Sequence, residues 1–166
     1  MSTSPSRATL AVAGGRTLGE SGTPVATPLV QSVNFMTEPG ARDELLYSRH
    51  GNTPNAVTLQ KRLALLEGSE ASLVLASGMG ATACTMLALL RAGDHLLASS
   101  WLYGGSRHLF EQELASQGIE VTFVDPTETR GWRRSVKHNT RVLFLESPVN
   151  PTTRVLDLRP VSLLAR

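Results

Sequence analysis

The feature that most constrains the fold is a regular alternation of short apolar segments and helical patterns in the second half of the chain. Four apolar segments are expected to form strands, at residues 72–76, 95–98, 119–124 and 141–146. The stretches between them, at residues 80–91, 106–117 and 127–137, have the spacing of helices. Because strands that are apolar on both faces are buried on both sides, the pattern predicts an α/β fold with a mostly parallel sheet and helices on both faces.

The chain before this alternating region has a different character. Residues 1–20 are rich in Ser, Thr, Ala and Gly, which predicts an extended N-terminal arm that is flexible or depends on a partner. Three prolines between residues 21 and 40 exclude a long helix there. Pro54 suits the first turn of a helix, and leucines at helical spacing extend that helix to Gly68.

Composition excludes several classes of function. The arginines are scattered with one adjacent pair, Arg133–Arg134, so the clustered basic residues of a nucleic-acid-binding protein are absent. The single cysteine, Cys84, excludes a disulfide framework and a zinc site, and its apolar helical surroundings predict a core position. No apolar run approaches the ~18 residues of a membrane span, and no secretory signal opens the chain. We therefore expect a soluble, cytoplasmic protein with no metal and no nucleic-acid or membrane partner.

Ligands of open parallel sheets bind at the carboxyl ends of the strands, so the residues that follow each strand are the candidates for a site. The turn around Gly78 and Met79 opens a helix, and its free amides could hold a phosphate. A tight turn without a ligand fits the same residues. The pattern Gly78-x-Gly80-x-x-Ala83 loosely matches a dinucleotide fingerprint, but the second strand ends without the carboxylate that fingerprint expects.

Three other positions combine polar or aromatic side chains with residues that fix the backbone. Tyr103 precedes two glycines, and it fits either a stacking partner for a planar ligand or an aromatic plug over the sheet. Glu146 and Asn150 lie in a proline-rich strand exit, where they fit ligand binding or an ordinary exit. Tyr47 and Arg49 lie before the alternating region and fit a phosphate clamp or a solvated loop.

Together, in this order and spacing, these motifs resemble the trans-sulfuration (Cys/Met metabolism) family of pyridoxal-phosphate enzymes. That family includes cystathionine synthases and lyases, methionine gamma-lyase and O-acetylhomoserine sulfhydrylases. The matching segments are Tyr47-Ser48-Arg49, Leu65-Leu66-Glu67-Gly68, Ser77-Gly78-Met79, Ala92-Gly93-Asp94-His95, Leu102-Tyr103-Gly104-Gly105 and Glu146-Ser147-Pro148-x-Asn150-Pro151. The resemblance runs from about residue 23 to the last residue. It implies the large-domain portion of a PLP-dependent transferase-like fold (fold type I).

The resemblance also implies roles for the candidate residues. The amides of Gly78 and Met79 would bind the phosphate of pyridoxal 5'-phosphate. Tyr103 would stack on the pyridine ring and act catalytically in proton transfer or leaving-group departure. Asn150, supported by Glu146, would lie near the phenolic oxygen of the ring.

Other implications concern a partner subunit and the extent of the chain. Tyr47 and Arg49 would reach the phosphate of a neighbouring subunit in a homodimer or homotetramer. We accordingly divide the chain into an arm and inter-subunit segment, residues 1–55, and an incomplete cofactor-binding α/β domain, residues 56–166. The chain is expected to stop before the Schiff-base lysine of the family, because neither Lys61 nor Lys137 has the context of that residue.

The implied activity is the formation or cleavage of a carbon-sulfur bond in methionine and cysteine metabolism. The substrate would be an amino acid of the cystathionine, methionine or O-acylhomoserine type, and these residues leave open which of them it is and whether the enzyme is a lyase or a synthase. Without the lysine, the chain alone is expected to be inactive. A non-catalytic remnant that binds a partner chain is the alternative, and a dinucleotide-binding domain is a weaker one.

Overall fold

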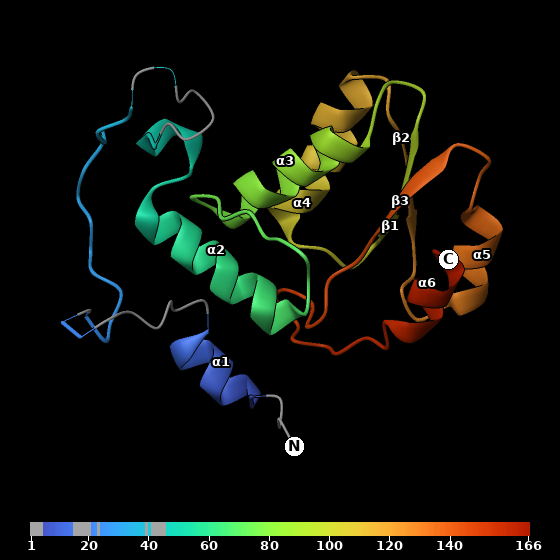
Figure 1. Ribbon diagram of the computed structural model, residues 1–166. Coiled ribbons are helices and arrows are strands. Elements are labelled where there is room, and N and C mark those ends of the chain that lie inside the picture. Colours follow the sequence, from blue (N-terminus) through green and yellow to red (C-terminus); the bar gives the residue numbers. More distant parts are fainter. Residues whose placement is uncertain (1–4, 15–20, 23, 39, 41–45) are drawn as a thin grey trace. The chain divides into compact units, whose positions relative to one another are not determined.

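The computed structural model describes residues 5–14, 21–22, 24–38, 40 and 46–166 (Figure 1). The chain forms two compact units, Met1–Leu75 and Ala76–Arg166. Helix α2, which we assign from the sequence to the second domain, therefore packs within the first unit. No helix in the described part is both long and apolar enough to cross a membrane.

The first unit is built mainly from two helices. Helix α1 spans Arg7–Ala13, and the hydroxyl of Ser6 accepts the Thr9 amide at its start. Helix α2 spans Pro54–Glu67 and ends at Gly68, whose φ of 64° is in the left-handed region that favours glycine. The prediction of α2 is confirmed.

The N-terminal arm contains more structure than we expect from its composition. The guanidinium of Arg7 donates to the carbonyl of Leu66 at 3.1 Å, and that of Arg62 donates to the carbonyl of Gly14 at 3.1 Å. Residues 7–13 of the predicted arm therefore form a helix, with a capping serine at its start and contacts with α2. Residues 1–4 and 15–20 of the arm lie outside the described residues.

The second unit is an α/β layer structure. Its elements are α3 (Gly78–Leu89), β1 (His95–Ser99), α4 (Gly104–His108), the π-helical turn η3 (Leu109–Leu114), β2 (Glu120–Val124), α5 (Thr129–Ser135), β3 (Thr140–Phe144) and α6 (Arg159–Leu164). The strands form a parallel sheet in the order β2-β1-β3. The predicted α/β class with a parallel sheet is confirmed.

Alternation along the central strand explains the two helical layers. Leu96 and Ala98 of β1 face a core that α3 and η3 complete, while Leu97 faces a second core with Trp132 of α5 and Val161 of α6. Helices consequently cover both faces of the sheet (Figure 1). All five residues of β1 are buried, so this strand is the centre of the unit.

Two sequence-based expectations are wrong. Residues 72–76 form no strand, and Leu73 is exposed. None of the described strands pairs with this segment, and a strand without a neighbour would leave its backbone groups without hydrogen bonds. Cys84 is exposed rather than in the core, because α3 buries only one stripe of its largely apolar surface, around Met86.

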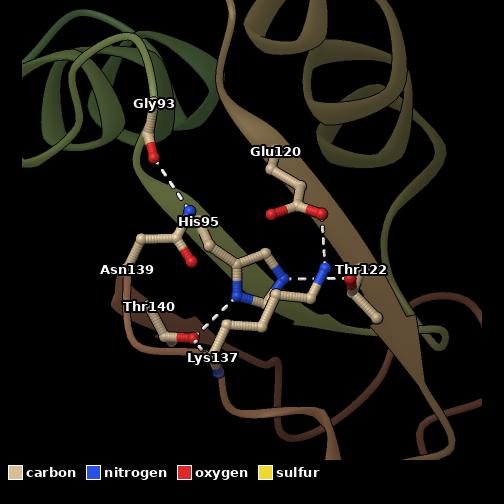
Figure 2. A network of polar contacts seen from close by, with 7 residues as sticks. All are labelled: Gly93, His95, Glu120, Thr122, Lys137, Asn139 and Thr140. Atoms are coloured by element: carbon tan, nitrogen blue, oxygen red, sulfur yellow. Dashed lines mark hydrogen bonds and ion pairs between the residues drawn. The ribbon is translucent and has the colours of Figure 1, made fainter.

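The amino end of the sheet is closed by a polar network around His95 (Figure 2). The buried imidazole lies 2.7 Å through Nδ1 from the hydroxyl of Thr140 and 2.9 Å through Nε2 from the hydroxyl of Thr122. One ring nitrogen of a neutral imidazole donates and the other accepts, so both are satisfied. Lys137 lies at the rim, where its ammonium pairs with the carboxylate of Glu120. Burial lowers the pKa of His95 below its ordinary value, the charge of Lys137 lowers it further, and Glu120 opposes both.

Candidate active site

The opposite, carboxyl end of the sheet carries an open hollow of about 460 Å³. Its walls come from the start of α3, the start of α4 and Glu146 in the segment that follows β3. The lining residues are Ser77, Gly78, Met79, Thr82, Tyr103, Ser106 and Glu146. Four of the residues predicted from the sequence therefore share one hollow: Gly78, Met79, Tyr103 and Glu146.

The start of α3 presents two backbone donors that have no partner among the described residues. The hydroxyl of Ser77 accepts the Gly80 amide at 3.0 Å, and the carbonyl of Ser77 accepts the Ala81 amide at 3.0 Å. The remaining first-turn amides, those of Gly78 and Met79, make no hydrogen bond to the described part of the chain. A helix start with two free amides and the positive end of the helix dipole is suited to an anion.

Tyr103 lies beside these amides with its ring in part exposed. A Cβ added to Gly105 would lie 2.5 Å from Cε1 of Tyr103 and 3.2 Å from Sδ of Met79, so the ring rests against the glycine and next to the methionine. Tyr103 is 46% exposed and lines the hollow, so part of it is accessible to a ligand there.

The carboxylate of Glu146 contacts both Tyr103 and Ser106. One carboxylate oxygen accepts the backbone amide of Tyr103 at 3.0 Å, and the other accepts the hydroxyl of Ser106 at 3.4 Å. Ser106 is buried, and its hydroxyl also lies 3.9 Å from Sδ of Met79. The three walls of the hollow are thus linked to one another through polar contacts.

Three other predicted site residues lie elsewhere. Asn150 is exposed and does not line the hollow, and no hydrogen bond joins it to Glu146 in the part of the chain that the structure describes. Tyr47 and Arg49 belong to the first unit, where the guanidinium lies 5.6 Å from the ring centroid of the tyrosine. There the tyrosine ring also meets the His50 ring edge-on at 5.4 Å.

Sequence reasoning missed three residues of the hollow, namely Ser77, Thr82 and Ser106. Ser77 has a recognisable signal, because a serine before a Gly-x-Gly helix start is a typical N-cap. Thr82 follows Gly78 by one helical turn, and its hydroxyl donates to the carbonyl of that residue at 3.2 Å. Among residues 5–14, 21–22, 24–38, 40 and 46–166, no group of three or more His, Cys, Asp or Glu side chains is placed to hold a metal ion.

Comparison with known sequences identifies the family. The family described as Cys/Met metabolism PLP-dependent enzyme matches residues 8–166. The chain belongs to this family. The resemblance inferred from the motifs is confirmed, and the cofactor of the family is pyridoxal 5'-phosphate.

Individual relatives and solved structures agree with this assignment. L-methionine gamma-lyase of Fusobacterium nucleatum subsp. nucleatum is 37% identical over 150 residues, which cover 85% of this chain and 38% of the relative. Cystathionine beta-lyase MetC of Bacillus subtilis is 38% identical over 146 residues, covering 86% of this chain and 36% of the relative. The crystal structure of metB from Corynebacterium glutamicum superposes with a TM-score of 0.88 at 28% identity, covering 96% of this chain and 42% of that one.

A second solved structure contains the cofactor. A putative O-acetylhomoserine (thiol)-lyase from Campylobacter jejuni, with N'-pyridoxyl-lysine-5'-monophosphate, superposes with a TM-score of 0.88 at 27% identity, covering 98% of this chain and 42% of that one. The chain thus spans about two fifths of the length of the proteins it matches. The hollow fits such a cofactor chemically, because free amides suit its phosphate and an adjacent aromatic ring suits its pyridine.

Proposed function

We propose that the hollow at the carboxyl end of the sheet holds pyridoxal 5'-phosphate, with the phosphate on the amides of Gly78 and Met79 and the ring beside Tyr103. The protein that contains this chain would form or cleave a carbon-sulfur bond of an amino acid of the cystathionine, methionine or O-acylhomoserine type. The observation that carries the proposal is the pair of unbonded amides beside a half-exposed tyrosine. The family assignment argues against the dinucleotide alternative.

Each wall of the hollow has a task in this proposal. The cofactor, when bound, supplies an electron sink for negative charge at the α-carbon of the substrate. The amides of Gly78 and Met79 donate charge-assisted hydrogen bonds to the phosphate and fix its position. The ring of Tyr103 would stack against the pyridine, and its hydroxyl would hold or pass a proton at the leaving group.

We further propose that this chain alone does not turn over substrate. Covalent attachment of the cofactor needs an unprotonated lysine amine in the hollow. The two lysines of the sequence are Lys61, which is exposed on α2, and Lys137, which pairs with Glu120 at the other end of the sheet, and neither lines the hollow. The amine would come from another segment or another chain. Turnover of methionine, cystathionine or O-acetylhomoserine by the purified chain would disprove this part.

An inter-subunit role for Tyr47 and Arg49 and a function for Asn150 belong to the same proposal. In a homodimer or homotetramer, the tyrosine and the arginine of one subunit would contact the phosphate in the next. Asn150 would lie near the phenolic oxygen of the cofactor in the complete site. Family membership supports these three assignments.

The phosphate seat is tested by removing one amide without breaking the helix. Ser77 has an extended backbone, with φ of −152° and ψ of 155°, so proline is tolerated at the next position, the first of α3. Gly78→Pro deletes the donor, whereas Gly78→Ala keeps it and places its Cβ in open space. A hydrogen bond to a charged group is worth about 1.5–3 kcal/mol, so Gly78→Pro should weaken binding of pyridoxal phosphate about 10- to 100-fold.

Equilibrium dialysis of the full chain with pyridoxal phosphate and with pyridoxal supplies the control. Pyridoxal lacks the phosphate, so its affinity should be the same in both Gly78 variants and the unmodified chain. Equal affinity of the proline and alanine variants for pyridoxal phosphate would contradict the proposed seat.

A further inference from the structure

The start of α4 has no local cap. A helix leaves its first amides without intrahelical partners, and a side chain at the N-cap position normally satisfies one of them. Tyr103 occupies that position and makes no side-chain cap hydrogen bond. Its own backbone amide is instead bonded to the carboxylate of Glu146 at 3.0 Å, 43 residues further along the chain.

This contact joins the exits of two neighbouring strands. Tyr103 follows β1 and Glu146 follows β3, and these strands pair in parallel in the sheet. The second carboxylate oxygen lies 3.4 Å from the hydroxyl of Ser106 in the first turn of α4. A negative charge near a helix start is also stabilised by the helix dipole.

We infer that Glu146 is a positioning residue that fixes the backbone of Tyr103 and thereby aims its ring into the hollow. The role of the ring rests on the proposed function, whereas the anchoring of its backbone rests on geometry alone. The position of the ring depends on a different residue, Gly105. The ring packs against this glycine, and a Cβ there would lie 2.5 Å from Cε1 of Tyr103. Backbone and ring are therefore held by different residues, and substitutions can separate the two.

Four variants distinguish the two constraints. Glu146→Ala removes both acceptors, while Glu146→Gln keeps one oxygen for the Tyr103 amide and offers its NH₂ to the Ser106 hydroxyl, which can accept. Gly105→Ala displaces the ring and leaves the carboxylate in place. Gly104→Ala is the matched control, because a Cβ at Gly104 meets nothing within 4 Å.

The test is hydrogen exchange of the full chain without cofactor, resolved at the Tyr103 amide, followed by ligand binding. Exchange at Tyr103 should be about tenfold faster in Glu146→Ala and close to the unmodified chain in Glu146→Gln, Gly105→Ala and Gly104→Ala. Unchanged exchange at the buried Leu97 shows that the sheet is intact. If Glu146→Ala does not fold, Glu146→Asp provides the same comparison, because the shorter side chain keeps the charge but moves the carboxylate away from the Tyr103 amide.

Binding then shows whether the anchored ring matters to a ligand. Glu146→Ala and Gly105→Ala should weaken pyridoxal and pyridoxal phosphate alike, about 2- to 10-fold, since the stacking contribution of an aromatic pair is about 0.5–1.5 kcal/mol. Unchanged exchange at Tyr103 in Glu146→Ala, or faster exchange that Glu146→Gln fails to rescue, would overturn the positioning role. Faster exchange in a chain that binds neither ligand would overturn the proposed function and leave the anchoring supported.

Discussion

The two ends of the same parallel sheet are built in opposite ways. At the amino end, both ring nitrogens of His95 meet threonine hydroxyls, and its backbone amide donates to the carbonyl of Asn139 at 2.8 Å. At the carboxyl end, the amides of Gly78 and Met79 have no partner in the described part of the chain, and they open into a hollow. Satisfied buried groups stabilise a fold, whereas accessible unsatisfied donors are available to a ligand. From this difference we expect the amino end to contribute stability and propose that the carboxyl end binds a ligand.

The largest expected effect comes from the closed end. His95→Leu replaces the imidazole by an apolar side chain, which leaves the hydroxyl of Thr122 without its partner and that of Thr140 with the backbone amide of Lys137 as its remaining partner. We expect the free energy of unfolding to fall by about 1–3 kcal/mol, the cost of leaving one part-buried polar group unsatisfied. Chemical denaturation followed by circular dichroism measures it. His108→Leu, at an exposed position on α4, is the control and should change stability by less than about 0.5 kcal/mol. Similar losses in both variants would contradict the special role of His95.

A smaller effect at the same end depends on pH. Burial lowers the pKa of His95 from its ordinary value of 6.5, and the charge of Lys137 acts in the same direction against Glu120. The unfolded chain therefore takes up a proton near pH 6.5 while the folded chain does not. Stability should be highest above this pH and should fall as the pH decreases below it, by at most about 1.4 kcal/mol per pH unit.

Denaturation midpoints between pH 5 and pH 8 test this slope. A His95→Gln variant should lose that part of the dependence, and His108→Gln should retain it. A slope that survives in His95→Gln would assign the proton to another group.

Sequence reasoning succeeded where local pattern decides the structure. The alternation of apolar segments predicted β1, β2 and β3. Gly78 and Tyr103, chosen from the glycine turns, line one hollow, and their binding roles stay predictions. It failed for residues 72–76, because a strand forms only where another strand pairs with it.

The polar contacts at both ends of the sheet depend on register, which the sequence does not display. Thr140 of β3 lies opposite His95 of β1, and the register of the two strands then shifts, so that the next pair is Leu96 and Val142. Ser106 likewise acquires its role only where the first turn of α4 meets the residue after β3. Such contacts join segments about 40 residues apart, so short motifs do not reveal them.

The smallest expected effect is at the open end. Tyr103→Ala should weaken retention of pyridoxal phosphate about 2- to 10-fold, because stacking contributes about 0.5–1.5 kcal/mol beyond its area. Tyr103→Phe keeps the ring and should retain the cofactor as well as the unmodified chain does. Dialysis of the full chain measures both. Equal retention in all three proteins would argue against stacking, and an equal loss in Tyr103→Phe and Tyr103→Ala would point to the hydroxyl.

The most direct test of the account is to locate bound pyridoxal phosphate on the sheet. Hydrogen exchange of the full chain, with and without the cofactor, reports both ends in one experiment. The account predicts slower exchange at Gly78, Met79 and Tyr103, with no change at His95 or Thr122. Inorganic phosphate at high concentration should reproduce the effect at the first two amides and leave Tyr103 unchanged. Protection at the amino end, or protection that omits Gly78 and Met79, would contradict the assignment of binding to the carboxyl end.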